Sequence, residues 1–267
     1  MLWLRSLAFN AVFYALLVGY MIAALPVFLL PRRLGFGVIR AWARSSLWAC
    51  RAIAGMHAEF RGLDRIPPGG LLVAAKHQSL WETFALLTVL DDPAYVLKRE
   101  LLWIPVFGWY ARKFRMIPVE RGGGAPALRK LLARAQAEIA KGRQIIIFPE
   151  GTRRPPGAPP AYRQGITRLY AQLGVPCLPV ALNSGVYWPR RRFLRRPGTI
   201  VVEFLEPIPP GLDGAEFVKI LQARIEGASR ALLTKPSRGN SANSSRNPGL
   251  DGASRDDMPQ DRCHLGG

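Results

Sequence analysis

The longest apolar stretch of the chain lies near its beginning. Residues 7–30 contain no charged side chain, although Gly19 and Pro26 interrupt the pattern. About 20 apolar residues suffice to cross the hydrocarbon core of a bilayer, so the length predicts a membrane helix. A signal peptide fits less well, because its apolar part is only about 7–15 residues long and no convincing small-residue cleavage site precedes Arg32. A buried core helix is the remaining alternative.

A second helix is predicted over residues 36–54. Its bulky apolar residues recur at roughly helical spacing, with Arg40, Arg44 and Arg51 between them. This pattern is typical of a helix in the headgroup plane of a membrane, and equally of an amphipathic core helix. The preceding apolar stretch favours the membrane. Arginines are more numerous after that stretch than before it, so we expect the cell inner membrane, with the rest of the chain on the cytoplasmic face.

From His57 onward, short apolar strands alternate with helical segments. Strands are predicted at 71–75, 95–97, 114–119, 144–148, 177–182 and 199–205, and helices at 79–90, 101–111, 126–141 and 217–233. This alternation is typical of an α/β fold with a mixed, largely parallel central sheet flanked by helices. The predicted domains are residues 1–55, the membrane-associated helical pair; 56–234, the α/β domain; and 235–267, a polar tail expected to be disordered.

Charge and cysteine content narrow the class of partner. The chain of 267 residues carries a formal net charge of +19, and residues 236–267 contain four arginines against four aspartates. The excess therefore lies in the body, which should attract nucleic acid, anionic lipid or a phosphorylated substrate. Cys50, Cys177 and Cys263 form no C-x-x-C pair. Neither a disulfide framework nor a metal site is predicted.

A histidine and a carboxylate follow the strand predicted at 71–75. His77 precedes Glu82 by five residues, and Ser79-Leu80-Trp81-Glu82 matches the S-x-x-E capping box. On an unbroken helix the two side chains would lie about 140° apart. They meet only if His77 lies in the turn before the helix, with Glu82 reaching back. Glu82 would then orient the imidazole, a natural base near pH 7. The alternative is a helix cap beside an ordinary polar residue.

Phe148-Pro149-Glu150-Gly151-Thr152-Arg153 follows the strand predicted at 144–148. Gly151 permits a sharp turn and the close approach of a ligand. Arg153 offers a guanidinium suited to phosphate oxygens. Glu150 can accept hydrogen bonds from a substrate hydroxyl or hold an arginine. Taken alone, the segment is better explained as a surface turn that contains an incidental ion pair.

Other cations also follow predicted strands. Arg121 precedes a glycine-rich turn and is a candidate anion ligand, and Lys98 is a weaker one. For both, the alternative is a solvated loop residue. A basic cluster beside Trp188 and Phe193 suits anionic lipid or an acidic protein partner, with a solvated loop as the alternative. Its members are Arg190, Arg191, Arg192, Arg195 and Arg196.

In this order, the segments resemble the four motifs of the 1-acylglycerol-3-phosphate acyltransferase family. His77 and Glu82 match the spacing of its histidine and aspartate, with Glu in the acid position. Arg121 matches the arginine that ends the second motif, Phe148 to Arg153 the third, and Val175 to Val180 the V-P-x-x-P-V strand of the fourth. The resemblance covers roughly residues 55–210, and the N-terminal helical pair also fits it.

The resemblance implies direct acyl transfer without a cofactor. His77 would take the proton from the free hydroxyl of lysophosphatidic acid as its oxygen attacks an acyl thioester of acyl carrier protein or coenzyme A, and Glu82 would support His77. Arg121, Arg153 and Lys98 would hold the phosphate, and Glu150 would position the acceptor. The implied substrate-binding set is Arg121, Glu150, Gly151, Thr152, Arg153 and Lys98.

Two alternatives to this function remain. Within the family, the acceptor could be another lysolipid such as a lyso-ornithine lipid. From a different class, a membrane-tethered protein that binds anionic lipid or nucleic acid would also explain the charge and the apolar N-terminus. That second alternative leaves the His77–Glu82 pair and the F-P-E-G-T-R segment unexplained. We therefore expect membrane lipid as a partner and no nucleic acid.

Overall fold

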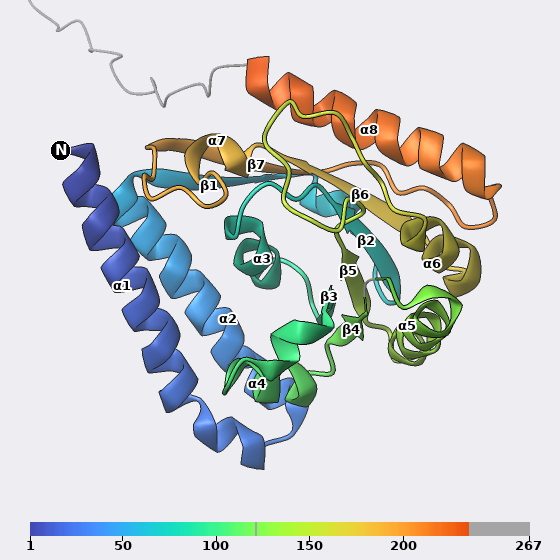
Figure 1. The fold of residues 1–267 in the computed structure, drawn as a ribbon, viewed down its shortest axis with the longest axis horizontal. Coiled ribbons are helices and arrows are strands. Elements are labelled where there is room, and N and C mark those ends of the chain that lie inside the picture. The colour runs from blue at the N-terminus through green and yellow to red at the C-terminus, as the bar shows by residue number, and fades with distance from the viewer. Residues whose placement is uncertain (121, 235–267) are drawn as a thin grey trace, which may run out of the picture. The chain divides into compact units, whose positions relative to one another are not determined.

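The computed structural model describes residues 1–120 and 122–234, which lie within one compact unit. Arg121 and the tail at 235–267, whose disorder the composition predicts, lie outside the described residues. Within the unit, helices cover both faces of a central sheet (Figure 1).

The sheet has seven strands in the order β1-β7-β6-β2-β5-β3-β4. The strands are β1 Met56–Arg61, β2 Leu71–Ala75, β3 Pro93–Lys98, β4 Ile117–Val119, β5 Gln144–Ile147, β6 Cys177–Leu182 and β7 Gly198–Phe204. All neighbours are parallel except β6 and β7, which are antiparallel. The mixed, largely parallel sheet expected from the sequence is thus confirmed.

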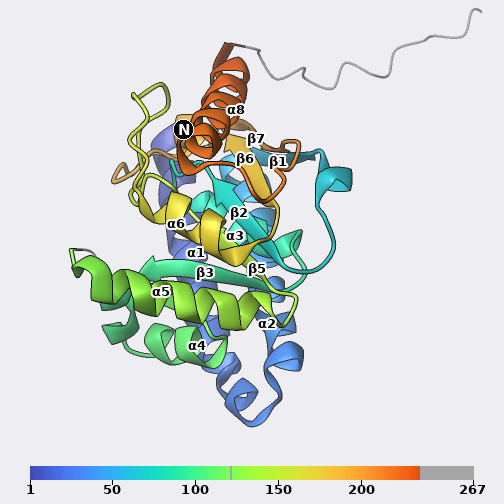
Figure 2. The ribbon, with the colours of Figure 1, turned by 90° about the vertical axis from the view of Figure 1, so that its right-hand side faces the viewer.

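The helices form two layers, and the alternation of the central strand shows why. Leu71, Val73 and Ala75 of β2 belong to one apolar core, and Leu72 and Ala74 belong to the other, because successive side chains of a strand point to opposite faces. On the first face lie α1 Leu2–Ala23, α2 Arg32–Ala49, α3 Trp81–Ala85 and α4 Phe107–Lys113; on the second lie α5 Gly124–Ile139, α6 Gly165–Leu173 and α8 Gly214–Thr234 (Figures 1 and 2).

The N-terminal helices differ from their predicted bounds. The α-helix α1 runs over Leu2–Ala23 instead of 7–30, and a 3₁₀ turn, Leu25–Leu29, follows it. Pro26 lies at the start of this turn, where it cannot donate the hydrogen bond that would continue the α-helix. Helix α2 begins at Arg32, and a single π-helical turn, Cys50–Ala54, extends it to Gly55, which has φ +67°.

Three other predictions were wrong in extent. The helix expected at 79–90 is α3, Trp81–Ala85, followed by a 3₁₀ turn, Leu86–Thr88. The helix expected at 101–111 is a 3₁₀ turn, Arg99–Trp103, and α4, since Pro105 separates them. The strand expected at 114–119 is only Ile117–Val119. Strand β1 was not predicted, because its residues show no clean alternation. Helix α6 was not predicted either, although Ile166, Leu169, Tyr170 and Leu173 recur at helical spacing and are buried.

Helix α1 packs against the α/β domain instead of standing away from it. Phe9 and Phe13 are buried, and both rings contact Trp188 at a centroid distance of 5.2 Å. The Arg5 guanidinium donates to the Ile53 carbonyl, and the Ser6 hydroxyl accepts from the backbone N–H of Arg195. The opposite side of α1 is exposed. One wall of this long apolar helix is therefore part of the protein core.

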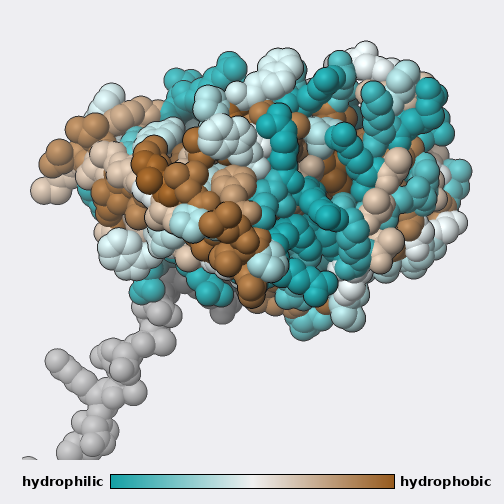
Figure 3. Space-filling view, turned by 90° about the horizontal axis from the view of Figure 1, so that it is seen from below, coloured by the Kyte–Doolittle hydropathy of each residue, from teal (hydrophilic) through white to brown (hydrophobic). Residues whose placement is uncertain are grey.

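Large apolar side chains are exposed on α1, on the turn after it, and around α4. They are Trp3, Leu4, Leu7, Tyr14, Val18, Ile22, Leu25, Leu29, Leu30 and Leu34 in the N-terminal part, and Trp103, Ile104, Phe107 and Trp109 around α4. The two groups adjoin, because the Tyr110 hydroxyl of α4 donates to the Met21 carbonyl and the Tyr110 ring contacts Phe28. Figure 3 views the molecule from below the orientation of Figure 1, and hydrophobic residues gather on one side of the face that it shows. We call this set the apolar surface.

Candidate active site

The turn between β2 and α3 brings His77 and Glu82 together. His77 Nδ1 lies 2.9 Å from Glu82 Oε1, as expected for a histidine in the turn before the helix. Glu82 Oε1 also accepts the backbone N–H groups of Gln78 and Ser79, each at 2.7 Å. The Ser79 hydroxyl in turn accepts the N–H of Trp81 at 3.2 Å. Glu82 thus makes the reaching-back half of a capping box and orients His77 with the same oxygen.

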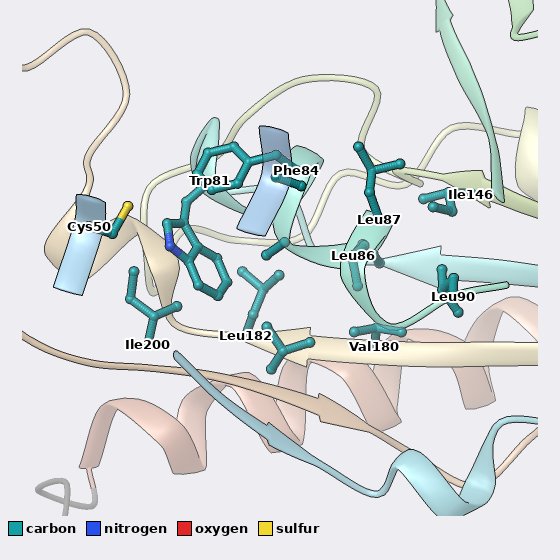
Figure 4. Close-up of a cluster of buried hydrophobic side chains, with 14 of the residues drawn as sticks. Cys50, Trp81, Phe84, Leu86, Leu87, Leu90, Ile146, Val180, Leu182 and Ile200 are labelled. Carbon is teal, nitrogen blue, oxygen red and sulfur yellow. The ribbon is translucent and has the colours of Figure 1, made fainter. Parts of the chain in front are cut away.

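The short helix that carries Glu82 is anchored from its other side. Trp81 and Phe84 are fully buried among side chains of the sheet and of α2. Figure 4 shows Trp81 between Cys50, Ile200 and Leu182, with Phe84 beside it. Burial of two aromatic side chains stabilises the fold by several kcal/mol. The helix therefore has one orientation, and the Glu82 carboxylate has one position.

The second oxygen of Glu82 is held by a residue that the sequence did not single out. The Ser184 hydroxyl, in α7 (Ser184–Tyr187) just after β6, donates to Glu82 Oε2 at 2.7 Å. The Glu82 side chain is fully buried and that of His77 is 14% exposed. Because Glu82 can only accept, the geometry assigns the proton on His77 to Nδ1 and leaves Nε2 as the free base.

The F-P-E-G-T-R segment wraps around His77. The Phe148 ring stacks on the imidazole, with centroids 3.9 Å apart and planes 15° apart. The backbone N–H of Arg154 donates to the His77 carbonyl at 2.8 Å. Between them Gly151 has φ +65°, a left-handed conformation that glycine adopts without a steric penalty. The two segments predicted separately from the sequence therefore form one site at the carboxyl end of β2 and β5.

Arginines gather beside this site. Burial, and after it the charge of Arg190, lowers the pKa of Arg153, and Arg191 acts in the same direction. Among the described residues, no carboxylate forms an ion pair with the Arg153 guanidinium. Arg190 donates to the Thr152 hydroxyl at 3.3 Å and to the Arg153 carbonyl at 3.2 Å. This arginine group holds uncompensated positive charge where an anionic substrate could neutralise it.

The other predicted ligands are less close to His77. The Glu150 side chain is buried and pairs with Lys76, at 3.0 Å between Nζ and Oε1. Lys98 ends β3, two strands from β2 in the sheet, and pairs with Glu100 at 3.1 Å. Arg121 lies outside the described residues, two positions after Val119, the residue paired with Lys98 in β4. The structure thus joins His77, Glu82, Gly151, Thr152 and Arg153, and it keeps Glu150 and Lys98 in ion pairs.

The basic cluster is divided. Arg190, Arg191 and Arg192 are exposed, as expected. Arg195 is buried instead: its guanidinium stacks over Trp188 at 4.5 Å, and burial lowers its pKa to about 10. It supports the loop structurally.

Ser184, Gln78 and Lys76 were not predicted as site residues. Gln78 lies within the first motif, and its side-chain oxygen accepts the N–H of Gly185 at 3.0 Å. Only the neighbouring ends of β2 and β6 bring these groups together, and no local pattern indicates that contact. The described residues contain no group of three or more His, Cys, Asp or Glu side chains that could hold a metal ion.

The fold and the site define a class of protein: an α/β transferase in which a carboxylate-oriented histidine lies beside a cationic patch. A model of the Acyltransferase family matches residues 57–183. The 1-acyl-sn-glycerol-3-phosphate acyltransferase of Pseudomonas aeruginosa is 38% identical over 189 residues, which cover 71% of this chain and 74% of that protein. The chain therefore belongs to the acyltransferase family, and the resemblance stated from the motifs is confirmed.

Two further comparisons bear on substrate and fold. The lyso-ornithine lipid O-acyltransferase of the same organism is 28% identical over 196 residues, covering 67% of this chain and 75% of that protein. The crystal structure of the 1-acyl-sn-glycerophosphate acyltransferase PlsC from Thermotoga maritima superposes with a TM-score of 0.76 at 23% identity, covering 89% of this chain and 100% of that one. The second likeness confirms the architecture.

Proposed function

We propose that this acyltransferase moves a fatty acyl group from an acyl thioester to the free hydroxyl of lysophosphatidic acid and so forms phosphatidic acid. The observation that carries the proposal is the 2.9 Å contact between His77 Nδ1 and Glu82, which leaves Nε2 available as a base. The name of the relative that is 38% identical supports the same acceptor.

The chemistry follows from that contact. His77 Nε2 takes the proton of the acceptor hydroxyl while the oxygen attacks the thioester carbonyl carbon. Glu82 keeps the imidazole oriented and stabilises the imidazolium, without taking the proton itself. The tetrahedral intermediate then collapses, the carbon–sulfur bond breaks, and the imidazolium returns the proton to the departing thiolate. Acyl carrier protein or coenzyme A carries the acyl group, and no cofactor is needed for these steps.

Arg153, with Arg190 and Arg191 behind it, is the proposed ligand of the acceptor phosphate. The Arg153 guanidinium is partly buried and lies beside like charges. A bound phosphate would offset that repulsion, which is a favourable electrostatic interaction. Arg121 and Lys98 are proposed as further phosphate ligands, and Gly151 and Thr152 as the turn that presents Arg153. A zwitterionic lyso-ornithine lipid would neutralise this group less completely, so we favour the phosphate over that acceptor.

The acceptor is proposed to enter from a membrane. The loop that carries Arg190 and Arg191 contacts α1, because the Phe193 ring stacks on Trp3 with centroids 4.7 Å apart and Asn10 donates to the Phe193 carbonyl at 3.3 Å. The arginine group therefore borders the apolar surface, where a lysolipid would keep its chain in lipid and its phosphate at the headgroup level. Because one side of α1 is core, we propose that α1 lies in one leaflet. The cytoplasmic face of the inner membrane, expected from the arginine distribution, is part of this proposal.

The test is thiol release from acyl-coenzyme A and acyl-acyl carrier protein by purified protein, with lysophosphatidic acid, lyso-ornithine lipid and other lysolipids as acceptors. We expect turnover with lysophosphatidic acid. His77→Ala should reduce kcat by about 10²–10⁴-fold, the usual contribution of a general base. His57→Ala is the matched control, since His57 is exposed on β1. Normal turnover by a folded His77→Ala protein would refute the mechanism, and preference for the ornithine lipid would refute the acceptor.

A further inference from the structure

A buried ion cluster lies on the other side of the strand from His77. Lys76 Nζ donates to Glu150 Oε1 at 3.0 Å and to Glu226 Oε1 of α8 at 2.7 Å. The side chains of Lys76 and Glu150 are 2% and 1% exposed, and that of Glu226 is 13% exposed. The Tyr162 hydroxyl also donates to Glu226, at 3.1 Å. One ammonium thus bridges two carboxylates from different elements.

The direction of these side chains follows from strand geometry. The backbone N–H of Lys76 still donates to the Val180 carbonyl of β6, so Lys76 continues the ladder of β2. It therefore points to the same face as Leu72 and Ala74, where α8 packs, and His77 points to the opposite face. Glu150 reaches Lys76 on the α8 side. Its carboxylate is therefore directed away from the face on which His77 meets Phe148.

We infer that Glu150 is a positioning residue that acts through Lys76 and does not contact the acceptor. Lys76 precedes His77 in the chain, and Glu150 lies two residues after Phe148, which stacks on the imidazole. The Lys76–Glu150 pair therefore fastens the F-P-E-G-T-R turn to the histidine turn, and Glu226 fastens both to α8. The inference rests on the proposed function, because it assigns a role within that reaction.

The electrostatics agree with this role. Burial raises the pKa of Glu150, with Lys76 acting against that rise, and Glu150 Oε2 has no hydrogen-bond partner among the described residues. The Glu150 carboxylate is buried, and one of its oxygens already accepts from the Lys76 ammonium. It is therefore poorly placed to bind the hydroxyl of a lipid that enters from a membrane. Glu226 differs, since with Lys76 it lines an open cavity of about 600 Å³ between α8 and residues 157–160. Water can therefore solvate Glu226 but reaches Glu150 far less.

The three partners are not equivalent, which makes the inference testable. Loss of Lys76 leaves two carboxylates without their cation, whereas loss of Glu150 leaves Lys76 paired with Glu226. Breaking one side of a buried ion pair is far more damaging than replacing both sides by apolar groups of similar volume. We therefore expect Lys76→Met to be the most damaging single change, and the double variant Lys76→Met/Glu150→Leu to recover part of the loss.

The experiment is a double-mutant cycle on the full-length protein. Glu150→Gln, Glu150→Leu, Lys76→Met and the double variant are assayed for kcat, for the KM of lysophosphatidic acid, and for melting temperature. We expect kcat to fall by about 10–10²-fold in the Lys76→Met and Glu150→Leu variants, because small misplacements of reacting groups have effects of this size. The acceptor KM should stay within about twofold of wild type, and the double variant should exceed Lys76→Met in kcat.

Glu138→Gln is the matched control. It breaks the buried pair with Arg143 at 2.7 Å, next to the amino end of β5 and so at the opposite edge of the sheet from His77. It should lower the melting temperature without changing kcat per folded protein. A tenfold or larger rise in acceptor KM for Glu150→Gln at unchanged kcat, or independent multiplication of the Lys76 and Glu150 effects, would overturn the inference. Wild-type protein without thiol release would instead overturn the proposed function.

Discussion

At the residue scale, one carboxylate organises the site. Glu82 receives hydrogen bonds from the backbone of Gln78 and Ser79, from the Ser184 hydroxyl and from His77. The first motif of the family has an aspartate at this position, and aspartate is one methylene shorter than Glu82. The longer side chain of Glu82 still reaches the histidine turn, because the turn and Ser184 close around it from both sides. Its length is thus compatible with a carboxylate-oriented base.

Ser184 should matter to catalysis although it lies outside the recognised motifs. Ser184→Ala leaves Glu82 Oε2 buried without its donor, a loss of about 1–3 kcal/mol. We expect kcat to fall by about tenfold or more, with a smaller change in the KM of the acceptor. Ser229→Ala is the control, because the buried Ser229 hydroxyl has no hydrogen-bond partner among the described residues. Equal kcat values for the two variants would exclude an orienting role for Ser184.

At the scale of elements, buried charges attach α2 and α5 to the sheet. Arg32 of α2 donates to both oxygens of Asp92, at 2.5 and 2.6 Å. Arg143, which is fully buried, binds Asp92 at 3.1 Å and Glu138 of α5 at 2.7 Å. Burial acts to raise the pKa values of Asp92 and Glu138. Hydrogen bonds from Arg32 to Asp92, and from Lys141 and Arg143 to Glu138, outweigh that effect and lower both pKa values.

This network predicts sensitivity to acid. A carboxyl group with a lowered pKa in the folded protein binds fewer protons there than in the unfolded chain. Its stabilising contribution is present above the ordinary pKa of about 4 and is lost as the pH falls below it. Glu150, with a raised pKa, contributes in the opposite sense, because its buried carboxylate opposes folding as the pH rises.

The measurement is urea unfolding between about pH 3 and pH 7. Asp92→Asn should lower the free energy of unfolding at pH 7 and flatten its decline toward acid, because the variant has no proton to bind at that position. The neighbouring Asp91→Asn is the control, since Asp91 is exposed. An Asp92→Asn variant as stable as wild type at pH 7 would show that the ion pairs of Asp92 with Arg32 and Arg143 do not stabilise the fold.

At the scale of the whole molecule, the apolar surface and the site adjoin each other. Helix α1 meets the length and hydropathy criteria for a membrane span, yet its Phe9 and Phe13 are core residues. We therefore expect the proposed association with a membrane to involve the exposed side of α1 together with the residues around α4. In the proposed arrangement, a lysolipid acceptor would reach the arginine group from the membrane without being extracted into water.

Vesicle binding tests this arrangement. Val18 and Ile22 lie four residues apart on α1 and are 54% and 63% exposed. Each contributes about 1.5–3 kcal/mol when buried in lipid, so Val18→Ser/Ile22→Ser should weaken binding to anionic vesicles at least about tenfold without lowering the melting temperature. The control is Leu63→Ser/Leu233→Ser, two exposed leucines outside α1 and α4. Undiminished flotation of the α1 variant with vesicles would contradict the proposed membrane face.

Much of the fold could be predicted from local pattern. The strands β2, β5 and β6 are compact apolar runs, and α5 and α8 carry one apolar face each, so their positions agree with prediction to within a few residues. Strand β1 and helix α6 were missed. In β1 the burial pattern does not alternate cleanly, since edge pairing with β7 and not a buried face holds it in place. Such an element depends on its partner strand.

The site divides in the same way. The chain by itself determined the His77–Glu82 pair, because the capping box joins Ser79 and Glu82, three positions apart, and His77 lies only two residues before Ser79. It also determined the turn at Gly151, which needs a residue free to adopt positive φ. Only the tertiary structure decided three further contacts. The Ser184 hydroxyl donates to the second oxygen of Glu82, Glu150 faces Lys76 and α8, and Arg195 is buried against Trp188. Those contacts join residues far apart in sequence, and the packing of parallel strand ends, which no local period encodes, brings them together.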